Sequence, residues 1–336
     1  MNKKISTLLK LTAIGIAAML SLSAANVPAY AETLIRLSTY VNEVDVRYSG
    51  FQHFADLVSE KTEGRVRVEI FPSAQLNGWS EGIDAVTGGV ADVSHISFDD
   101  RLPCYRAGAF YPASVNLDNQ IELDAEITAV LADEAAKIGL VNIMSSNASF
   151  DQEWWFREPI KDLGNLDGLQ VRTIGPLVTM MIKSWGGSPV FVAPKEVFQS
   201  AERGVVDGIN MGVATYSSWK LWTVMPYMIN ADLFYVKVHY MMNKNKFDAL
   251  GAGDQNAILE AGTESEEWLK PRYEAWINEK VGNAVMSGGG SAISLNKEQR
   301  DSLLAKIQPG WDKELNKTCG NKTADKIRAI LAKHSQ

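Results

Sequence analysis

Hydrophobic and polar positions in the first half of the chain alternate with the period of a strand in some segments and follow the period of a helix in others. Residues 33–40 (TLIRLSTY), 65–71 (RVRVEIF) and 90–98 are predicted strands. Residues 44–62 and 78–87 carry apolar side chains at helical spacing, and each segment stops at a glycine shortly afterwards. This strand–helix–strand–helix–strand order favours parallel pairing through helical crossovers.

The second half of the chain repeats this alternation. The predicted strands are 140–145, 151–156, 168–173, 189–192 and 231–243, and the predicted helices are 118–138, 176–185 and 194–203. From residue 244 onward the pattern is almost entirely helical, with a break at 287–291. Two α/β halves of this kind favour a bilobed protein, in which a small molecule binds between the lobes and hinge closure traps it.

The first 31 residues have the pattern of a secretory signal. Three lysines precede an apolar stretch at 11–22, and Ala29-Tyr30-Ala31 has the small-residue spacing of a cleavage site. A membrane anchor is the alternative, but the apolar stretch is short for a span of about 20 residues. We therefore expect export to the periplasm and a mature chain that begins at Glu32. No cysteine lies near the cleavage site, which argues against a lipid anchor.

Charge and length narrow the class of protein further. Loss of three lysines with the signal changes the formal charge from −7 to −10, and the mature length is 336 − 31 = 305 residues. An acidic chain is a poor partner for nucleic acid, because binding to phosphates needs basic patches. A chain of this length fits two lobes better than one compact core.

The sequence contains no motif for catalysis, a metal or a cofactor. Its four histidines form no metal-binding spacing, and no nucleophile elbow is present. We therefore predict a protein that is not an enzyme and needs no cofactor. Cys104 and Cys319 fit either a disulfide, which an exported protein permits, or two buried thiols, and the sequence does not choose between them.

The most informative residue is an arginine within a predicted strand. Arg172 lies between Val171 and Thr173, after a loop rich in turn residues. A buried charge is costly unless it is paired, and the guanidinium group binds a carboxylate with two parallel hydrogen bonds. Arg172 is therefore the candidate anchor for an anionic ligand.

Three sequence blocks in order carry a family resemblance: FADLVSEKTEGRVRVEIFPSAQLNG, PIKDLGNLDGLQVRTIG and SPVFVAPKEVFQSAERGVVDG. With them the chain, from about Thr33 to the C-terminal helices, resembles the DctP-like solute-binding proteins of tripartite ATP-independent periplasmic (TRAP) transporters. The resemblance implies a two-lobed α/β periplasmic-binding-protein fold of class II type, with a ligand cleft between the lobes and a long helix that spans both. It also implies delivery of the ligand to small and large permease subunits in the membrane, driven by an ion gradient. In this family the arginine at the position of Arg172 binds the ligand carboxylate.

We assign the lobes from the predicted elements and this resemblance together. Residues 32–154 and about 238–280 are expected to form lobe I, and residues 155–237 and about 281–336 lobe II. Residues 1–31 are the predicted signal peptide.

The chain departs from the sialic-acid-binding members at three positions. Gln152 stands where they have a second ligand-binding arginine, and Met211, one residue after Asn210, stands where they have an asparagine. Pro194 replaces a phenylalanine that often stacks on the ligand. The predicted pocket thus keeps one cationic anchor and gains apolar surface at Met211 and, by strand parity with Gln152, at Trp154.

One cation with aromatic and thioether walls favours an aromatic or apolar monocarboxylate, with an aromatic amino acid or an indole-type acid as the most specific prediction. Glu43 or Glu153 is the expected partner for the ammonium group of an amino acid. The predicted site comprises Arg172, Gln152, Trp154, Asn210, Met211, Glu43 and Phe98. Four alternatives remain: a dicarboxylate, an ectoine-like zwitterion, a periplasmic enzyme on a similar bilobed fold, or a binding module that feeds a membrane sensor or an ATP-driven permease.

Overall fold

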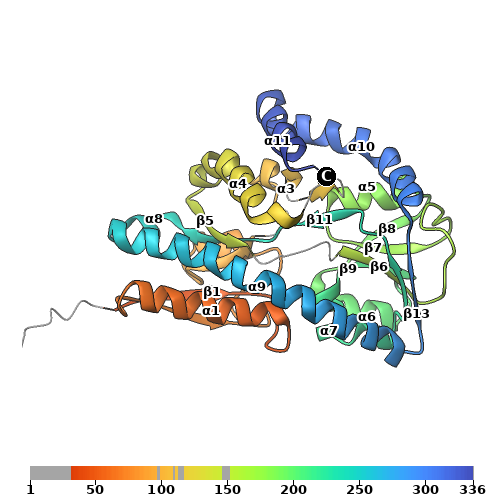
Figure 1. Cartoon of the computed structure of the whole chain (residues 1–336), viewed down its shortest axis with the longest axis horizontal. Coiled ribbons are helices and arrows are strands. Elements are labelled where there is room, and N and C mark those ends of the chain that lie inside the picture. The colour runs from red at the N-terminus through yellow and green to blue at the C-terminus, as the bar shows by residue number, and fades with distance from the viewer. Residues whose placement is uncertain (1–31, 97–98, 109, 113–116, 146–151, 336) are drawn as a thin grey trace, which may run out of the picture. The chain divides into compact units, whose positions relative to one another are not determined.

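The computed structural model describes residues 32–96, 99–108, 110–112, 117–145 and 152–335 (Figure 1). The first part of the chain forms β1(Thr33–Ser38), α1(Val46–Lys61), β2(Val66–Phe71), α2(Gly82–Thr87), β3(Val93–Ile96), α3(Pro103–Gly108), β4(Phe110–Pro112), η1(Leu117–Asn119), α4(Gln120–Lys137) and β5(Leu140–Ser145). The middle part forms β6(Gln152–Phe156), β7(Gln170–Thr173), α5(Pro176–Ser184), β8(Ser188–Phe191), η2(Pro194–Glu196), α6(Val197–Glu202), β9(Gly208–Gly212), α7(Val213–Ser218), η3(Leu221–Thr223) and β10(Tyr227–Asn230). The last part forms β11(Phe234–Val236), β12(His239–Asn243), α8(Lys244–Asp248), α9(Ala252–Ser287), β13(Ser291–Ser294), α10(Lys297–Cys319) and α11(Asn321–Lys333).

Each of the two larger sheets is the centre of one lobe. The two sheets have a similar arrangement of parallel and antiparallel strands. The first sheet has the order β2-β1-β3-β12-β5, in which β12 is antiparallel to both of its neighbours. The second sheet has the order β8-β7-β9-β6-β10-β13, in which β6 is antiparallel to both of its neighbours. In each sheet the antiparallel strand comes from the segment that crosses over from the other lobe. The two-lobed α/β fold expected from the sequence is confirmed.

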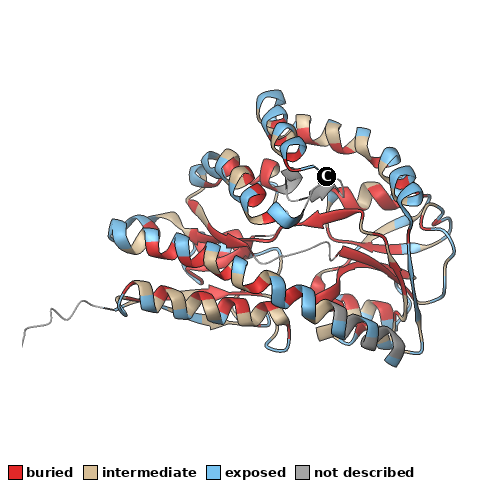
Figure 2. Ribbon diagram, in the orientation of Figure 1, coloured by how far each residue is buried: buried red, intermediate tan, exposed pale blue. Residues whose placement is uncertain are grey.

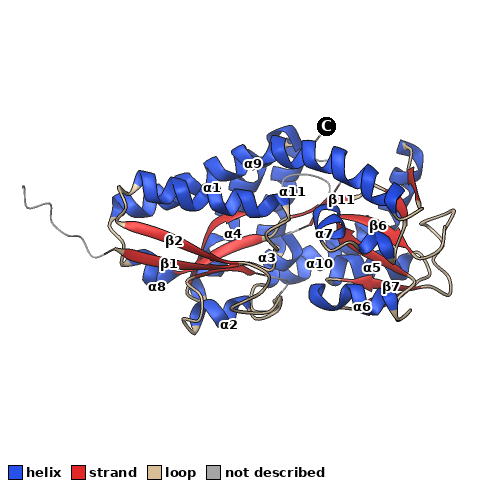
Figure 3. Cartoon of the chain, turned by 90° about the horizontal axis from the view of Figure 1, so that it is seen from below, coloured by secondary structure: helices blue, strands red, loops and turns tan. Residues whose placement is uncertain are grey.

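The chain connects the two sheets three times. It passes from β5 to β6, from β10 through β11 to β12, and along the 36-residue helix α9; β11 pairs with β4 in a separate two-stranded sheet. Figures 1 and 3 show α9 beside α1, and its contacts extend from α1 and β5 at one end to α7 and β13 at the other. The long helix that spans both lobes is therefore present. The predicted lobe boundary between residues 154 and 155 falls within β6.

The central strands of both sheets, β3 and β12 in the first and β6 and β9 in the second, are almost wholly buried (Figure 2). One face of the first sheet packs against α1 and α9 through Phe51, Phe54, Val58 and Ile258. One face of the second sheet packs under α6 and α7, and the other faces of the two sheets join in one continuous core with α4, α5 and α10. The apolar stripes of these helices explain their positions, because each buries one side and leaves the other to solvent.

Two expectations from the sequence differ from the observed elements. The segment predicted as one strand over 231–243 forms two short strands in different sheets, β11 and β12. Strands β9 and β10 were not predicted, although β9 lies between β6 and β7 in the second sheet. Both differences occur where chain crossing or glycine content hides the period of a strand.

A buried carboxyl group on α9 gives the stability of the protein a pH dependence. Glu266 accepts a hydrogen bond from the Ser145 backbone at the end of β5, and burial raises the pKa of this carboxyl from 4.5 to about 7. The folded protein therefore holds this proton more tightly than the unfolded chain does. Stability from this group is present at low pH and is lost as pH rises toward about 7.

We therefore expect the melting temperature of the wild type, relative to a Glu266→Gln variant, to fall between about pH 4.5 and pH 7. The change in unfolding free energy should reach at most about 3 kcal/mol. Thermal unfolding of both proteins across this range measures the difference. Parallel pH curves for the two proteins would contradict the assignment.

Within the described residues, no helix combines the length and the apolar character that are needed to cross a lipid bilayer.

Candidate functional site

The segments that follow the carboxyl ends of parallel strands in the two sheets meet around one cavity. In the first sheet these segments follow β1 and β2, and in the second sheet they follow β8 and β9. Ligand sites of open α/β sheets lie at this edge, because the loops there are free to vary while the strands hold them in place. The cavity thus occupies the position that the predicted interlobe cleft requires.

The cavity has a volume of about 370 Å³, within the range of small-molecule sites. Its lining is rich in aromatic side chains from both lobes: Tyr40 and Trp79 on one side, Phe198 and Trp219 on the other. The rings of Tyr40 and Trp79 meet edge to face, with their centroids 4.7 Å apart. The remaining lining residues are Asn42, Ser73, Ala74, Gly78, Ser80, Glu81, Ala193, Pro194 and Lys195.

Arg172 lies directly behind this lining, near the end of β7. Its side chain is 1 % exposed, and its Nε donates to the carbonyl oxygen of Val192, the residue before the lining residue Ala193, at 3.0 Å. Its Nη1 donates to the carbonyl oxygen of Asn210 at 2.7 Å and lies 3.8 Å from the sulfur of Met211. Among the described residues, Nη2 has no hydrogen-bond partner. A buried guanidinium whose Nη2 is unused can donate hydrogen bonds to an anion.

Within the part of the chain that the structure describes, no acidic side chain pairs with this guanidinium. Burial lowers the pKa of Arg172 to about 9, opposed by the hydroxyl of Tyr40, so the group is still a cation at neutral pH. Burial also lowers the pKa of His95, which packs against the rings of Tyr40 and Trp79, to about 4. His95 is therefore neutral above about pH 5 and adds no positive charge. A carboxylate that reaches Arg172 would relieve an unfavourable buried charge.

The predicted residues on β6 and β9 are divided between the two faces of the second sheet. Met211 shares a face with Arg172, in line with their contact. Gln152, Trp154 and Asn210 lie on the opposite face. Trp154 is fully buried and packs edge to face on Trp185 in the core, whereas the amide nitrogen of Asn210 donates to the carbonyl oxygens of Gln152 and Glu153. The structure thus brings Met211 and the backbone of Asn210 to Arg172, but not Trp154.

The two acidic residues expected to bind an ammonium group, Glu43 and Glu153, do not line the cavity. Glu43 is exposed in the loop before α1, next to the lining residue Asn42. The carboxylate of Glu153 is buried and accepts hydrogen bonds from the backbone N–H groups of Ala231 and Asp232. Phe98 lies outside the described residues.

The site predicted from the sequence includes none of the four aromatic side chains that line the cavity. Tyr40 and Trp79 follow β1 and β2, and Trp219 ends α7. The available signal was their position just after the carboxyl ends of predicted strands, where α/β proteins collect binding residues. Pro194, which replaces a stacking phenylalanine, does line the cavity, together with Phe198 four residues later.

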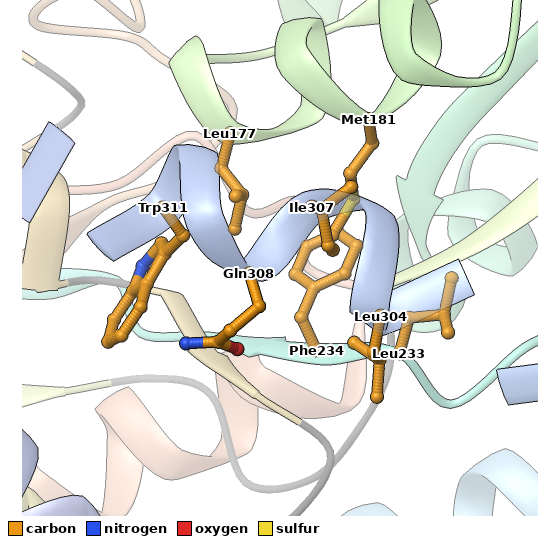
Figure 4. A pocket seen from close by; sticks show the side chains of 8 residues that line it. All are labelled: Leu177, Met181, Leu233, Phe234, Leu304, Ile307, Gln308 and Trp311. Atoms are coloured by element: carbon orange, nitrogen blue, oxygen red, sulfur yellow. The ribbon is translucent and has the colours of Figure 1, made fainter. Parts of the chain in front are cut away.

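A second cavity, beneath α10, is too small to bind a solute. It has a volume of about 20 Å³, enough for about one water molecule. Figure 4 shows side chains from α5, α10 and the segment around β11 converging on it, namely Leu177, Met181, Leu233, Phe234, Leu304, Ile307, Gln308 and Trp311. We interpret it as a packing gap in the core.

Comparisons with known proteins point to one group. The sequence profile described as "bacterial extracellular solute-binding protein, family 7" (DctP) matches residues 37–318. The C4-dicarboxylate-binding protein DctB of Bacillus subtilis is 24 % identical over 267 residues, which cover 76 % of this chain and 75 % of that protein.

Two solved structures share the fold. DctP7 of Bordetella pertussis, an extracytoplasmic solute receptor that binds pyroglutamic acid, has a TM-score of 0.79 at 20 % identity and covers 89 % of this chain and 99 % of its own. A TRAP periplasmic solute-binding protein of Desulfovibrio salexigens with bound orotic acid has a TM-score of 0.81 at 17 % identity, with coverages of 90 % and 99 %.

Proposed function

Because the chain belongs to family 7 of the bacterial extracellular solute-binding proteins, we propose that it is the receptor of a TRAP transporter and binds an organic acid through Arg172. The observation that carries this proposal is the buried guanidinium behind the interlobe cavity, with its Nη2 unused among the described residues. The receptor would deliver its ligand to the membrane subunits of the permease. Residues 1–31 would act as the export signal to the periplasm.

We propose that the ligand is an aromatic or apolar monocarboxylate. Four aromatic rings line the cavity, and each ring that stacks on a ligand adds about 0.5–1.5 kcal/mol beyond simple burial. Among the described residues, Arg172 is a buried cation beside the cavity without a carboxylate partner, whereas the buried Arg47 is paired with Asp45 and Lys195 lies exposed at the lining. A dicarboxylate would therefore find a desolvated partner for one of its charges only.

Between an indole-type acid and an aromatic amino acid, we favour the acid. An amino acid needs a carboxylate for its ammonium group, and the carboxylate of Glu153 already binds two backbone N–H groups. Glu43 is exposed outside the cavity lining. Glu81, which does line the cavity, is also exposed and accepts a hydrogen bond from the Gly78 backbone at 2.6 Å.

A thermal-shift panel tests the ligand class. Indole-3-acetate and phenylacetate should each raise the melting temperature by several degrees, because a ligand at 100 times its Kd stabilises the folded state by about 2.7 kcal/mol. L-Tryptophan should stabilise less. Malate, succinate, pyroglutamate and galacturonate are the comparison set. Stabilisation by malate or succinate alone would contradict the proposed class, and mass spectrometry of the released ligand should show it chemically unchanged.

A further inference from the structure

A buried arginine at the start of α1 contacts structural elements on both sides of the cavity. Arg47 is 2 % exposed, and its Nε and Nη2 donate to the two carboxylate oxygens of Asp45 at 2.9 and 2.6 Å. Although burial opposes the charge, Asp45 holds the pKa of Arg47 well above its ordinary value. A charged pair this deeply buried is stable only while its hydrogen bonds are complete.

The two terminal nitrogens of Arg47 donate hydrogen bonds to residues of both lobes. Nη1 donates to the hydroxyl oxygen of Tyr40, a lining residue of the first lobe, at 2.9 Å. Nη2 also donates to the hydroxyl oxygen of Thr215 on α7, in the second lobe, at 2.7 Å. The hydroxyl of Ser218 on the same helix lies 3.4 Å from a carboxylate oxygen of Asp45.

Thr215 connects this network to the opposite wall. The backbone N–H of Trp219, a lining residue that follows α7, donates to the carbonyl oxygen of Thr215 at 3.0 Å. α7 also packs on α9 through Ala214, Leu269 and Tyr273. The hydrogen bond between Arg47 and Thr215 therefore links the segment that carries Trp219 to the side chain that contacts Tyr40.

We propose that Arg47 is a positioning residue of the ligand site. It holds Tyr40 in one wall and, through Thr215, holds α7 and Trp219 at a fixed spacing in the other. The bridge between the lobes, formed by Asp45, Arg47 and Thr215, favours the closed arrangement, in which the aromatic walls fit a ligand. Its effect on affinity rests on the proposed function, whereas its effect on lobe closure does not.

Thr215→Val tests this proposal, because it removes the interlobe acceptor and leaves the Asp45–Arg47 pair intact. Thr215→Ser keeps the hydroxyl and should restore the wild-type behaviour. The matched control is Thr62→Val, at another buried threonine, whose hydroxyl bonds, among the described residues, to the backbone of Val58 and Val66 within the first lobe. This control lowers stability without touching the bridge or the cavity.

Small-angle X-ray scattering of the ligand-free proteins comes first. Thr215→Val should have a larger radius of gyration than the wild type, Thr215→Ser and Thr62→Val. Stopped-flow tryptophan fluorescence with indole-3-acetate as the probe follows, and Thr215→Val should release it about tenfold faster at an unchanged association rate.

The outcomes separate the two proposals. An unchanged radius for Thr215→Val overturns the bridge, even if the probe binds well to the wild type. A larger radius with unchanged probe release overturns the positioning role. If the radius responds but the wild type does not bind the probe, the bridge stands and the proposed ligand class fails.

Discussion

Arg172→Ala is expected to abolish high-affinity binding of the organic acid while the protein remains folded. The guanidinium provides the buried cation beside the cavity, and a charge-assisted hydrogen bond contributes about 1.5–3 kcal/mol. Loss of the contacts to a carboxylate should weaken binding at least about a hundredfold. Isothermal titration calorimetry with the best acid of the thermal-shift panel measures the change.

The folded state should tolerate this loss because the charge has no carboxylate partner within the described residues. Its removal leaves the carbonyl groups of Val192 and Asn210 without this donor, but it also removes a costly desolvation. Arg67→Ala, at an exposed arginine on β2, is the matched control and should bind normally. Unchanged affinity in Arg172→Ala would refute the central assignment, and an intermediate affinity in Arg172→Lys would show that charge alone restores part of the binding.

The sequence indicates Arg172 as a buried charge because this signal is local, and the structure shows the residue buried on β7. A charge within a predicted strand marks a position where burial is costly unless a partner is present. The order of the strands around Arg172 was harder to predict from the sequence. β9 contains glycine at both ends, and glycine is depleted in strands. At Gly208 a Cβ atom would come within 2.5 Å of the ring of Phe156 on β6, so tertiary packing selects glycine there.

The face on which each candidate lies needed the register as well as the period. Strand parity alone places Gln152 and Trp154 on one side of β6, but it does not say which side of β6 matches the side of β7 that carries Arg172. The register pairs Trp155 with Ile209 and Ile209 with Arg172. It is therefore Trp155 that shares the face of Arg172, where its ring stacks on Tyr216.

The aromatic walls could not be predicted from periodicity, because they lie in segments without a period. Tyr40 and Trp79 are brought together by the parallel pairing of β1 and β2, and Trp219 reaches them only through the packing of α7. The positions of such residues are set by the way the two lobes pack against each other. The periodicity of a single strand or helix does not contain this information.

Loss of the disulfide between Cys104 and Cys319 is expected to have the largest effect on stability. The two cysteines, which the sequence left open as a bond or two thiols, are bonded and join α3 to the end of α10 across 215 positions of sequence. A cross-link that closes a loop of this length restricts the unfolded chain, and the chain-entropy relation gives a stabilisation of about 5 kcal/mol, although measured values are typically about 2–4 kcal/mol. In chemical denaturation, the Cys104→Ala/Cys319→Ala double variant should lose about 2–4 kcal/mol of unfolding free energy.

The same experiment separates stability from function. The bond lies in the core that α10 shares with α3 and α5, and neither α3 nor α10 contributes to the lining of the ligand cavity. The double variant should therefore bind the acid with wild-type affinity at temperatures where it is folded, and a reductant should no longer change its unfolding midpoint. A loss below about 1 kcal/mol would mean that packing of α10 already fixes these helices without the bond.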